Sequence, residues 1–331
     1  MPVHAYDAPV SATTLPVSYE DVLAAREAIA GRLHRTPVLS SATLSRRVGA
    51  TVALKAELFQ RTGSFKPRGM LNVLAGLSSD EKARGVITIS AGNAAQSLAY
   101  CSALEEIDCL VVMWQGASEA KLAATREYGA TIDLESLDPA AAFDRVAELQ
   151  EQTGRVFVHS FDDPRLIAGH GSLGLELVED VPQLGTVVVP IGGGGLISGV
   201  ATALKPAGVR VVGVEPELSP AMHAALEAGE PVTVEPRSVA DGLNAPFAGE
   251  NTLAICRELV DELVLVSEDE IADAMRFLYQ RAKLACEPAG AASTAALLSG
   301  KVQLDAGSTT VAVVSGGNVA ASTAVAILAA G

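Results

Sequence analysis

The chain has 331 residues, of which 49% are hydrophobic, so it is long and apolar enough to form about two domains and is not a disordered chain. Its formal net charge of −15 offers no basic face to phosphates, and we expect no nucleic-acid partner. Four cysteines without C-x-x-C spacing, and a first segment unlike a secretory leader, predict a protein of the reduced cytoplasm.

Apolar and β-branched runs in the first half of the chain predict short strands separated by helices. After a loosely held tail over residues 1–17, we expect a helix over residues 19–33 with Ser18 as its cap. Alternation of strand and helix predicts a parallel sheet with helices on its faces. The strands are predicted at residues 51–57, 86–89, 109–113, 131–134 and 156–158.

A second set of strands is predicted at residues 186–190, 209–215, 262–266 and 309–314. A helix over residues 267–283 begins with a capping box of Ser267 and Glu270. The longest apolar run, residues 186–204, contains five glycines and a proline, so it predicts a strand, a turn and a helix rather than a membrane span. The chain is therefore expected to be an α/β protein with two sheets and a ligand cleft between them.

Lys66 stands where a loop is expected to become a helix. Pro67 suits the first helical position and should push Lys66 into an extended conformation. The positive end of a helix and an apolar surround would both disfavour the ammonium form and leave a neutral amine that can attack a carbonyl. The alternative is a solvated surface lysine.

Four consecutive glycines, Gly192, Gly193, Gly194 and Gly195, lie between a predicted strand and a predicted helix. Such a loop lets backbone amides surround an anion at the helix start, so it predicts a phosphate site rather than a flexible turn. A dinucleotide site is the more specific alternative, because Glu215 ends the next strand about where a ribose-binding acid is expected. An NAD-dependent dehydrogenase therefore stays open as an alternative.

Two further turns follow predicted strands, Ser90-Ala91-Gly92-Asn93 and Ser315-Gly316-Gly317-Asn318. From the residues alone, Asn93 could simply cap the next helix, and the second turn could be an ordinary connection between strand and helix.

These stretches together resemble the fold-type II pyridoxal-phosphate enzymes of the threonine dehydratase and serine racemase family. The run from Thr62 to Gly69 is similar to the family's lysine motif, the other stretches follow in the family's order, and the similarity covers nearly the whole chain. The resemblance implies a large cofactor-binding domain of residues 1–57 and 160–331, of the tryptophan-synthase-β-like kind. A smaller domain of residues 58–159 would close over an amino-acid substrate, and a homodimer or homotetramer is implied.

The resemblance also implies roles for single residues. Lys66 would carry pyridoxal 5′-phosphate as a Schiff base and act as the catalytic base. The turn of Ser90, a second candidate catalytic residue, would hold the substrate carboxylate. Asn93 would meet the 3′-oxygen of the cofactor and the Ser315 hydroxyl its ring nitrogen. The full implied cofactor-binding set is Phe65, Lys66, Asn93, Gly192, Gly193, Gly194, Gly195, Gly242, Glu287 and Ser315.

Three positions depart from the family's patterns. Ala91 stands where serine racemases have a serine, and an alanine cannot transfer a proton, so elimination is expected over racemisation. Ala94 replaces the family's histidine and opens space beside the substrate. Glu215 matches a metal-ligand acid of the family, but Ala221 replaces the second carboxylate, which leaves a monovalent or divalent cation as an open expectation.

The implied reaction is β-elimination of a 3-hydroxy amino acid such as L-threonine or L-serine to a 2-oxo acid and ammonia. Alternatives within the family are a serine racemase and a dehydratase of another 3-hydroxy amino acid, of the 3-hydroxyaspartate or phenylserine type. We expect a small-molecule substrate and no membrane partner.

Overall fold

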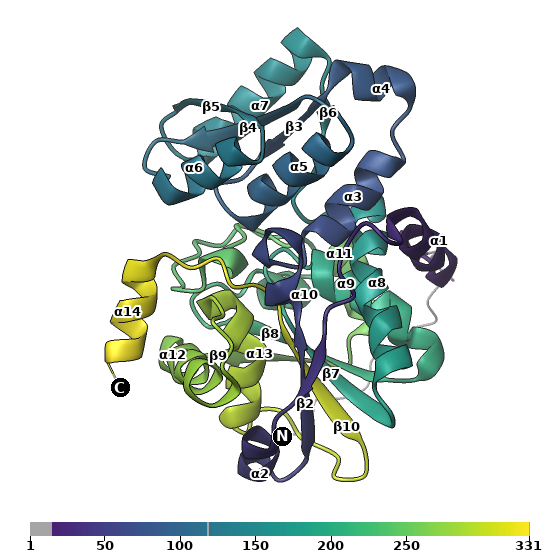
Figure 1. Ribbon diagram of the computed structural model, residues 1–331, viewed down its shortest axis with the longest axis vertical. Coiled ribbons are helices and arrows are strands. Elements are labelled where there is room, and N and C mark those ends of the chain that lie inside the picture. The colour runs from purple at the N-terminus through teal and green to yellow at the C-terminus, as the bar shows by residue number, and fades with distance from the viewer. Residues whose placement is uncertain (1–14, 118, 331) are drawn as a thin grey trace.

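The computed structural model describes residues 15–117 and 119–330 and shows two lobes, each built on its own sheet (Figure 1). The sheet of the large lobe has six strands in the order β1-β2-β10-β7-β8-β9. β1 pairs antiparallel with β2, and every other neighbouring pair is parallel. These strands are β1 (Val38–Ser40), β2 (Thr51–Ala56), β7 (Leu184–Pro190), β8 (Arg210–Pro216), β9 (Glu262–Val266) and β10 (Thr309–Val314).

The sheet of the small lobe has four parallel strands in the order β5-β4-β3-β6. They are β3 (Val86–Ile89), β4 (Cys109–Trp114), β5 (Thr131–Ser136) and β6 (Val156–Phe157). Each strand predicted from the sequence is confirmed to within two residues at either end. The predicted α/β class is confirmed as well. The three-residue strand β1 was not predicted, because so short a segment carries no alternating pattern.

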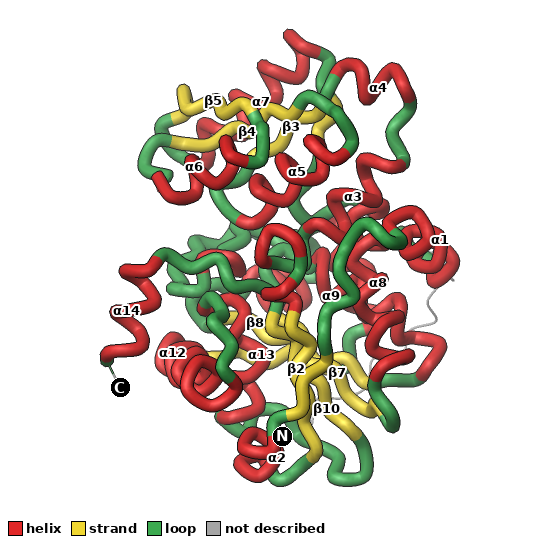
Figure 2. The backbone as a smooth tube through the Cα atoms, in the orientation of Figure 1, coloured by secondary structure: helices red, strands yellow, loops and turns green. Residues whose placement is uncertain are grey.

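Helices cover both faces of each sheet (Figure 2). In the large sheet, Val188 and Val212 pack with α12 (Glu268–Phe277) and α13 (Pro288–Leu298). Their neighbours Val187 and Val211 pack with α8 (Pro164–Asp180) and α9 (Gly195–Leu204). This alternation is what a doubly wound sheet requires. The helices are α1 (Tyr19–Ile29), α2 (Ala42–Val48), α3 (Pro67–Ala75), α4 (Ser79–Arg84), α5 (Asn93–Leu104), α6 (Glu119–Glu127), α7 (Pro139–Thr153), α8 (Pro164–Asp180), α9 (Gly195–Leu204), α10 (Ala221–Ala228), α11 (Glu250–Leu259), α12 (Glu268–Phe277), α13 (Pro288–Leu298) and α14 (Ala321–Ala329).

The predicted helix starts are confirmed, but two predicted helix ends are wrong. Ser18 caps α1 as expected, and α1 ends at Ile29 because Gly31 takes a left-handed φ of 71°. The capping box at Ser267 is present, but α12 ends at Phe277 and a single π-helical turn (Leu278–Ala282) follows it.

The predicted N-terminal tail is only partly testable. Its residues 1–14 lie outside the described residues. Val17 is described and is only 2% exposed, packed beside Val22 of α1, so this end of the predicted tail is not loose.

Connections that follow parallel strands place the candidate residues at one edge of each sheet. Ser90 follows β3, the glycine loop follows β7, Ser315 follows β10, and Lys66 lies between β2 and α3. Carboxyl ends of parallel strands meet at a common edge, where α/β proteins bind ligands. None of the described helices combines the length and apolar character needed to cross a bilayer.

Candidate active site

A cavity of about 610 Å³ lies between the lobes. All ten residues of the predicted cofactor-binding set line it, and so does Ser90. Stretches more than two hundred residues apart in the chain are thus brought to one place. Glu215 is outside the lining.

The backbone at Lys66 differs from the prediction. Pro67 occupies the first turn of α3 as expected, but Lys66 is helical, with φ −53° and ψ −37°, and not extended. The amide of Arg68 donates to the Phe65 carbonyl at 3.1 Å, and the amide of Met70 donates to the Lys66 carbonyl at 3.2 Å. Both bonds require a helical residue at position 66, and they override the usual restriction before proline.

Lys66 is half-buried, and its side chain lines the cavity between the lobes. Its Nζ donates to the Ser160 carbonyl at 2.7 Å. Burial lowers the pKa of Lys66 to about 8, although the nearby charge of Glu287 acts to raise it. A large fraction of the amine is therefore neutral near pH 8 and able to attack a carbonyl.

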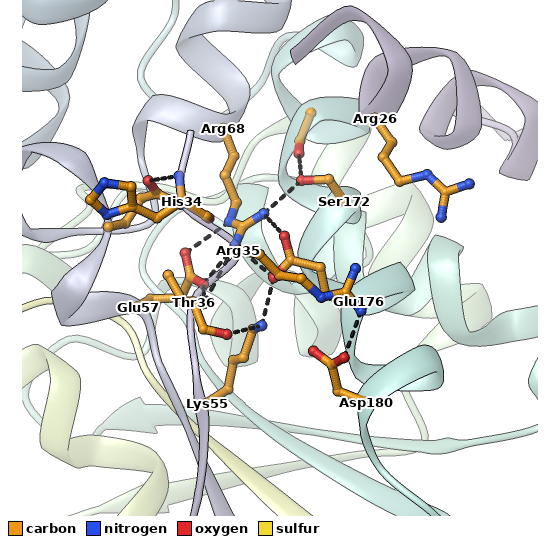
Figure 3. Close-up of polar contacts among 12 residues, drawn as sticks. Arg26, His34, Arg35, Thr36, Lys55, Glu57, Arg68, Ser172, Glu176 and Asp180 are labelled. Atoms are coloured by element: carbon orange, nitrogen blue, oxygen red, sulfur yellow. Dashed lines mark hydrogen bonds and ion pairs between the residues drawn. The ribbon is translucent and has the colours of Figure 1, made fainter. Parts of the chain in front are cut away.

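Helix α3, which follows Lys66, is fixed by a buried charge network (Figure 3). Arg68 donates through Nε to Glu57 at 2.9 Å and through Nη1 to Glu176 of α8 at 2.7 Å. Lys55 of β2 also donates to Glu176. The Arg68, Glu57 and Lys55 side chains are at most 2% exposed. The network therefore fixes the start of α3, and with it Lys66, to the large lobe.

The glycine loop has the properties of a phosphate site. α9 begins at Gly195, and Gly194 before it takes a left-handed φ of 97°. A Cβ added at Gly193 would lie 2.3 Å from Cγ of Phe161, so a side chain would collide there. Within the described residues, the amides of Gly192, Gly193 and Gly194 donate to no protein group. Free amides at the positive end of a helix suit an anion.

Asn93 does not cap a helix, and that interpretation is wrong. Gly92 is the cap position of α5, and no side chain caps it. Instead, Asn93 Nδ2 donates to Glu287 Oε1 at 2.8 Å, and Asn318 Nδ2 donates to Asn93 Oδ1 at 2.8 Å. These bonds join α5 of the small lobe to the large lobe. Burial raises the pKa of Glu287 to about 8, so its carboxyl group is largely protonated at pH 7.

Ser315 and Gly242 complete the lining on the side of the large lobe. The Ser315 carbonyl accepts from the Phe65 amide at 3.1 Å, whereas its hydroxyl bonds to no other group in the described part of the chain. That hydroxyl suits a ring nitrogen. A Cβ at Gly242 would lie 3.0 Å from Cβ of Ala289, so the loop passes the cavity edge closely.

The Ser90 turn contributes to the cavity lining from the small lobe. Ser90 Oγ accepts from the Gly92 amide at 3.1 Å, and Ala91 presents only a methyl group to the cavity. A catalytic role for Ser90 therefore stays a prediction.

Glu215 is a buried acid whose carboxylate caps the start of α10. Its two oxygens accept from the amides of Met222 and His223, at 2.7 and 2.8 Å, at the start of α10. Burial raises the pKa of Glu215 to about 8, although these two hydrogen bonds act to lower it. The described residues contain no group of three or more His, Cys, Asp or Glu side chains placed to hold a metal ion. Metal binding by Glu215 stays a prediction.

The segment of His159, Ser160 and Phe161 lines the cavity beside Lys66 and was not among the predicted site residues. His159 Nδ1 accepts from the amides of Phe161 and Asp162, at 3.2 and 2.9 Å. Burial lowers the pKa of His159 to about 4, so the ring is neutral and carries its proton on Nε2. Its position in the sequence could have indicated that it lines the site, because it directly follows a predicted parallel strand.

Comparison with known proteins decides the family. The sequence model of the family described as pyridoxal-phosphate dependent enzyme matches residues 29–316. The chain belongs to this family. The reactive amine, the glycine amides and the Ser315 hydroxyl fit pyridoxal phosphate, and the dinucleotide alternative is no longer needed.

Similar proteins narrow the class of this pyridoxal-phosphate enzyme. L-threonine dehydratase catabolic TdcB of Escherichia coli (strain K12) is 44% identical over 309 residues, 92% of this chain and 94% of that protein. Maize serine racemase has a TM-score of 0.89 and 35% identity, with 93% and 95% of the two chains covered. The T.th. threonine deaminase has a TM-score of 0.85 and 39% identity, with 92% and 99% covered. The expected fold type II and the expected class, a pyridoxal-phosphate-dependent ammonia-lyase, are confirmed.

Proposed function

We propose that this enzyme converts L-threonine or L-serine to the corresponding 2-oxo acid and ammonia by β-elimination. The observation that carries the proposal is that the Lys66 amine, the glycine amides and the Ser315 hydroxyl line the same cavity. Relatives named for threonine dehydration and deamination support the choice of substrate. The water lost in the elimination is regained in hydrolysis, so the net change is loss of ammonia.

Pyridoxal phosphate, when bound, supplies a sink for the electrons left at the α-carbon of the amino acid. The Lys66 amine would hold the cofactor and take the α-proton, since its lowered pKa leaves it a base near neutral pH. The glycine amides would bind the phosphate and the Ser315 hydroxyl the ring nitrogen. The Ser90 turn would orient the substrate carboxylate.

An assay for 2-oxo acids with L-threonine, L-serine and 3-hydroxyaspartate tests this function. The wild type is expected to release 2-oxo acid from the first two, and Lys66→Ala to release none. Lys205→Ala, at an exposed lysine outside the cavity, is the matched control and is expected to keep full activity. Turnover retained by Lys66→Ala would overturn the proposal.

Serine racemisation is the second candidate, because a solved racemase shares this fold at 35% identity. Racemisation needs a proton donor on the face opposite the lysine, and Ala91 supplies none. We therefore expect pyruvate to form from L-serine faster than D-serine does. Chiral chromatography of the products decides between the two.

Four finer features stay predictions: closure of residues 58–159 over the substrate, assembly as a homodimer or homotetramer, an activating monovalent or divalent cation, and a cytoplasmic location. Sedimentation of the purified protein and activity titrations with K⁺ and Mg²⁺ test the assembly and the cation.

A further inference from the structure

The phenylalanines and the tryptophan of this chain are concentrated in one place. Five of the seven phenylalanines and the single tryptophan line the cavity, whereas none of the five tyrosines does. Chance placement would scatter them through both cores, where aliphatic side chains instead predominate. These cavity residues are Phe65, Trp114, Phe143, Phe157, Phe161 and Phe247.

Five rings form a continuous row, which we call the aromatic row. Its successive ring centroids, from Phe157 through His159, Phe161 and Phe247 to Phe143, are 5.8, 4.5, 5.6 and 6.4 Å apart. Phe157 and Phe143 come from β6 and α7 of the small lobe, and Phe247 precedes α11 of the large lobe. The row therefore forms one wall that spans both lobes.

The aromatic row passes beside the reactive amine between His159 and Phe161. Lys66 Nζ donates to the carbonyl of Ser160, the residue between His159 and Phe161. The Phe143 end is 43% exposed, a large apolar surface left in contact with water. An apolar group attached to a substrate held at Lys66 would cover such a surface.

The charges of the cavity do not favour an acidic substrate side chain. Lys121 at the cavity wall is ion-paired with Asp241. Ala94, which lines the cavity and is 4% exposed, contributes no polar group. Beyond the groups assigned to the cofactor and the substrate carboxylate, the lining is mainly apolar, made of rings and aliphatic residues, with the amides of Gln96 and Asn244 among its polar groups.

We propose that the preferred substrates are 3-hydroxy amino acids with a bulky apolar or aromatic group on the β-carbon, of the phenylserine type. This proposal rests on the proposed function and extends it to a substrate class. Enclosing a phenyl ring should favour such a substrate over L-threonine by about tenfold or more in kcat/KM.

Trp114 gives a binding readout that does not depend on turnover, because it is the only tryptophan and lines the cavity. L-phenylalanine and L-alanine lack a β-hydroxyl leaving group and can be titrated into the holoenzyme while Trp114 fluorescence is followed. We expect L-phenylalanine to bind at least tenfold more tightly than L-alanine.

Variants in the aromatic row locate the effect. Phe247→Ala should weaken L-phenylalanine binding at least fivefold more than L-alanine binding. Phe143→Ala, at the exposed end of the row, should weaken L-phenylalanine binding less but in the same direction. Phe59→Ala removes an exposed ring that does not line the cavity and should change neither.

The outcomes separate this proposal from the proposed function. Tight L-phenylalanine binding without turnover of any hydroxy amino acid would support the apolar site and contradict the lyase function. Turnover of L-threonine with L-phenylalanine bound no more tightly than L-alanine would overturn the apolar site and leave the function intact. Tighter binding of L-aspartate than of L-phenylalanine would also overturn it.

Discussion

Lys66 combines a nucleophilic amine with an enclosure that makes ammonium unfavourable. Its pKa of about 8 lies below the ordinary value of 10.5 because burial outweighs the attraction of Glu287. Only the neutral amine attacks an aldehyde, so its concentration sets the rate of cofactor attachment.

We therefore predict that covalent attachment of pyridoxal phosphate to the apoprotein accelerates between pH 7 and 9, with a midpoint near 8. Absorbance after rapid mixing measures the rate, and Lys66→Ala provides the blank. A midpoint near that of an ordinary lysine would show that the amine is solvated.

Glu287 predicts a pH-dependent stability. Its pKa is about 8 in the folded protein and about 4.5 when unfolded, so the folded state holds the proton more tightly. Ionisation above pH 4.5 favours the unfolded state, and stability is lost progressively up to pH 8. Glu287→Gln should gain about 2–4 kcal/mol in unfolding free energy, relative to the wild type, between pH 5 and pH 8.

Urea denaturation of both proteins at the two pH values measures this difference, and other titrating groups cancel in the comparison. Glu230→Gln, at an exposed acid, is the control and should show no change with pH. An equal stability difference for Glu287→Gln at pH 5 and pH 8 would mean that Glu287 is ionised in the folded protein.

The resemblance of the sequence to the pyridoxal-phosphate family predicted which residues line the site, and only the turns at Ser90, Gly192 and Ser315 also follow from their place after predicted parallel strands. It did not predict how they bond to one another. The Asn93 contacts with Glu287 and Asn318 join positions 194 and 225 residues apart, and no local pattern records such a pair. The helical backbone at Lys66 likewise depends on its neighbours' hydrogen bonds.

At the scale of elements, α3 is held in place by ion pairs between buried side chains as well as by apolar packing. Arg68 carries the only guanidinium in the described network, and it meets the carboxylates of both Glu57 and Glu176. Removing one partner from a buried network leaves charges without compensation.

Arg68→Met should lower the unfolding free energy by about 3–5 kcal/mol, because Glu57 and Glu176 lose their partner. Thermal and urea denaturation measure the loss. Arg237→Met, in an exposed pair with Glu235, should change stability by less than about 1 kcal/mol. Similar losses for the two variants would show that the Arg68 network contributes no more than a surface pair.

Element prediction succeeded where local patterns determine the structure. The buried strands of both sheets and the caps at Ser18 and Ser267 follow from such patterns. The π-helical turn after α12 and the buried network depend on contacts between distant segments, so the sequence alone did not indicate them.

At the scale of the whole molecule, contacts across the cavity join the lobes. Lys121 of α6 pairs with Asp241 of the large lobe, and the rings of Phe143 and Phe247 lie 6.4 Å apart. The two charged side chains are 32% and 52% exposed, so salt should screen their attraction.

Asp241→Asn should raise KM by about two- to fivefold, because the pair that helps to hold the lobes together is lost. Added salt should raise KM of the wild type and leave that of the variant nearly unchanged. Steady-state kinetics at low and high ionic strength measure both. An identical salt response of the two proteins would exclude a role for this pair in substrate binding.

The attachment of the cofactor to Lys66 is the claim on which the rest depends. Borohydride reduction of the protein loaded with pyridoxal phosphate, followed by peptide mass spectrometry, tests it directly. The predicted result is one pyridoxyl adduct, on Lys66. An adduct on another lysine, or none at all, would contradict the assignment.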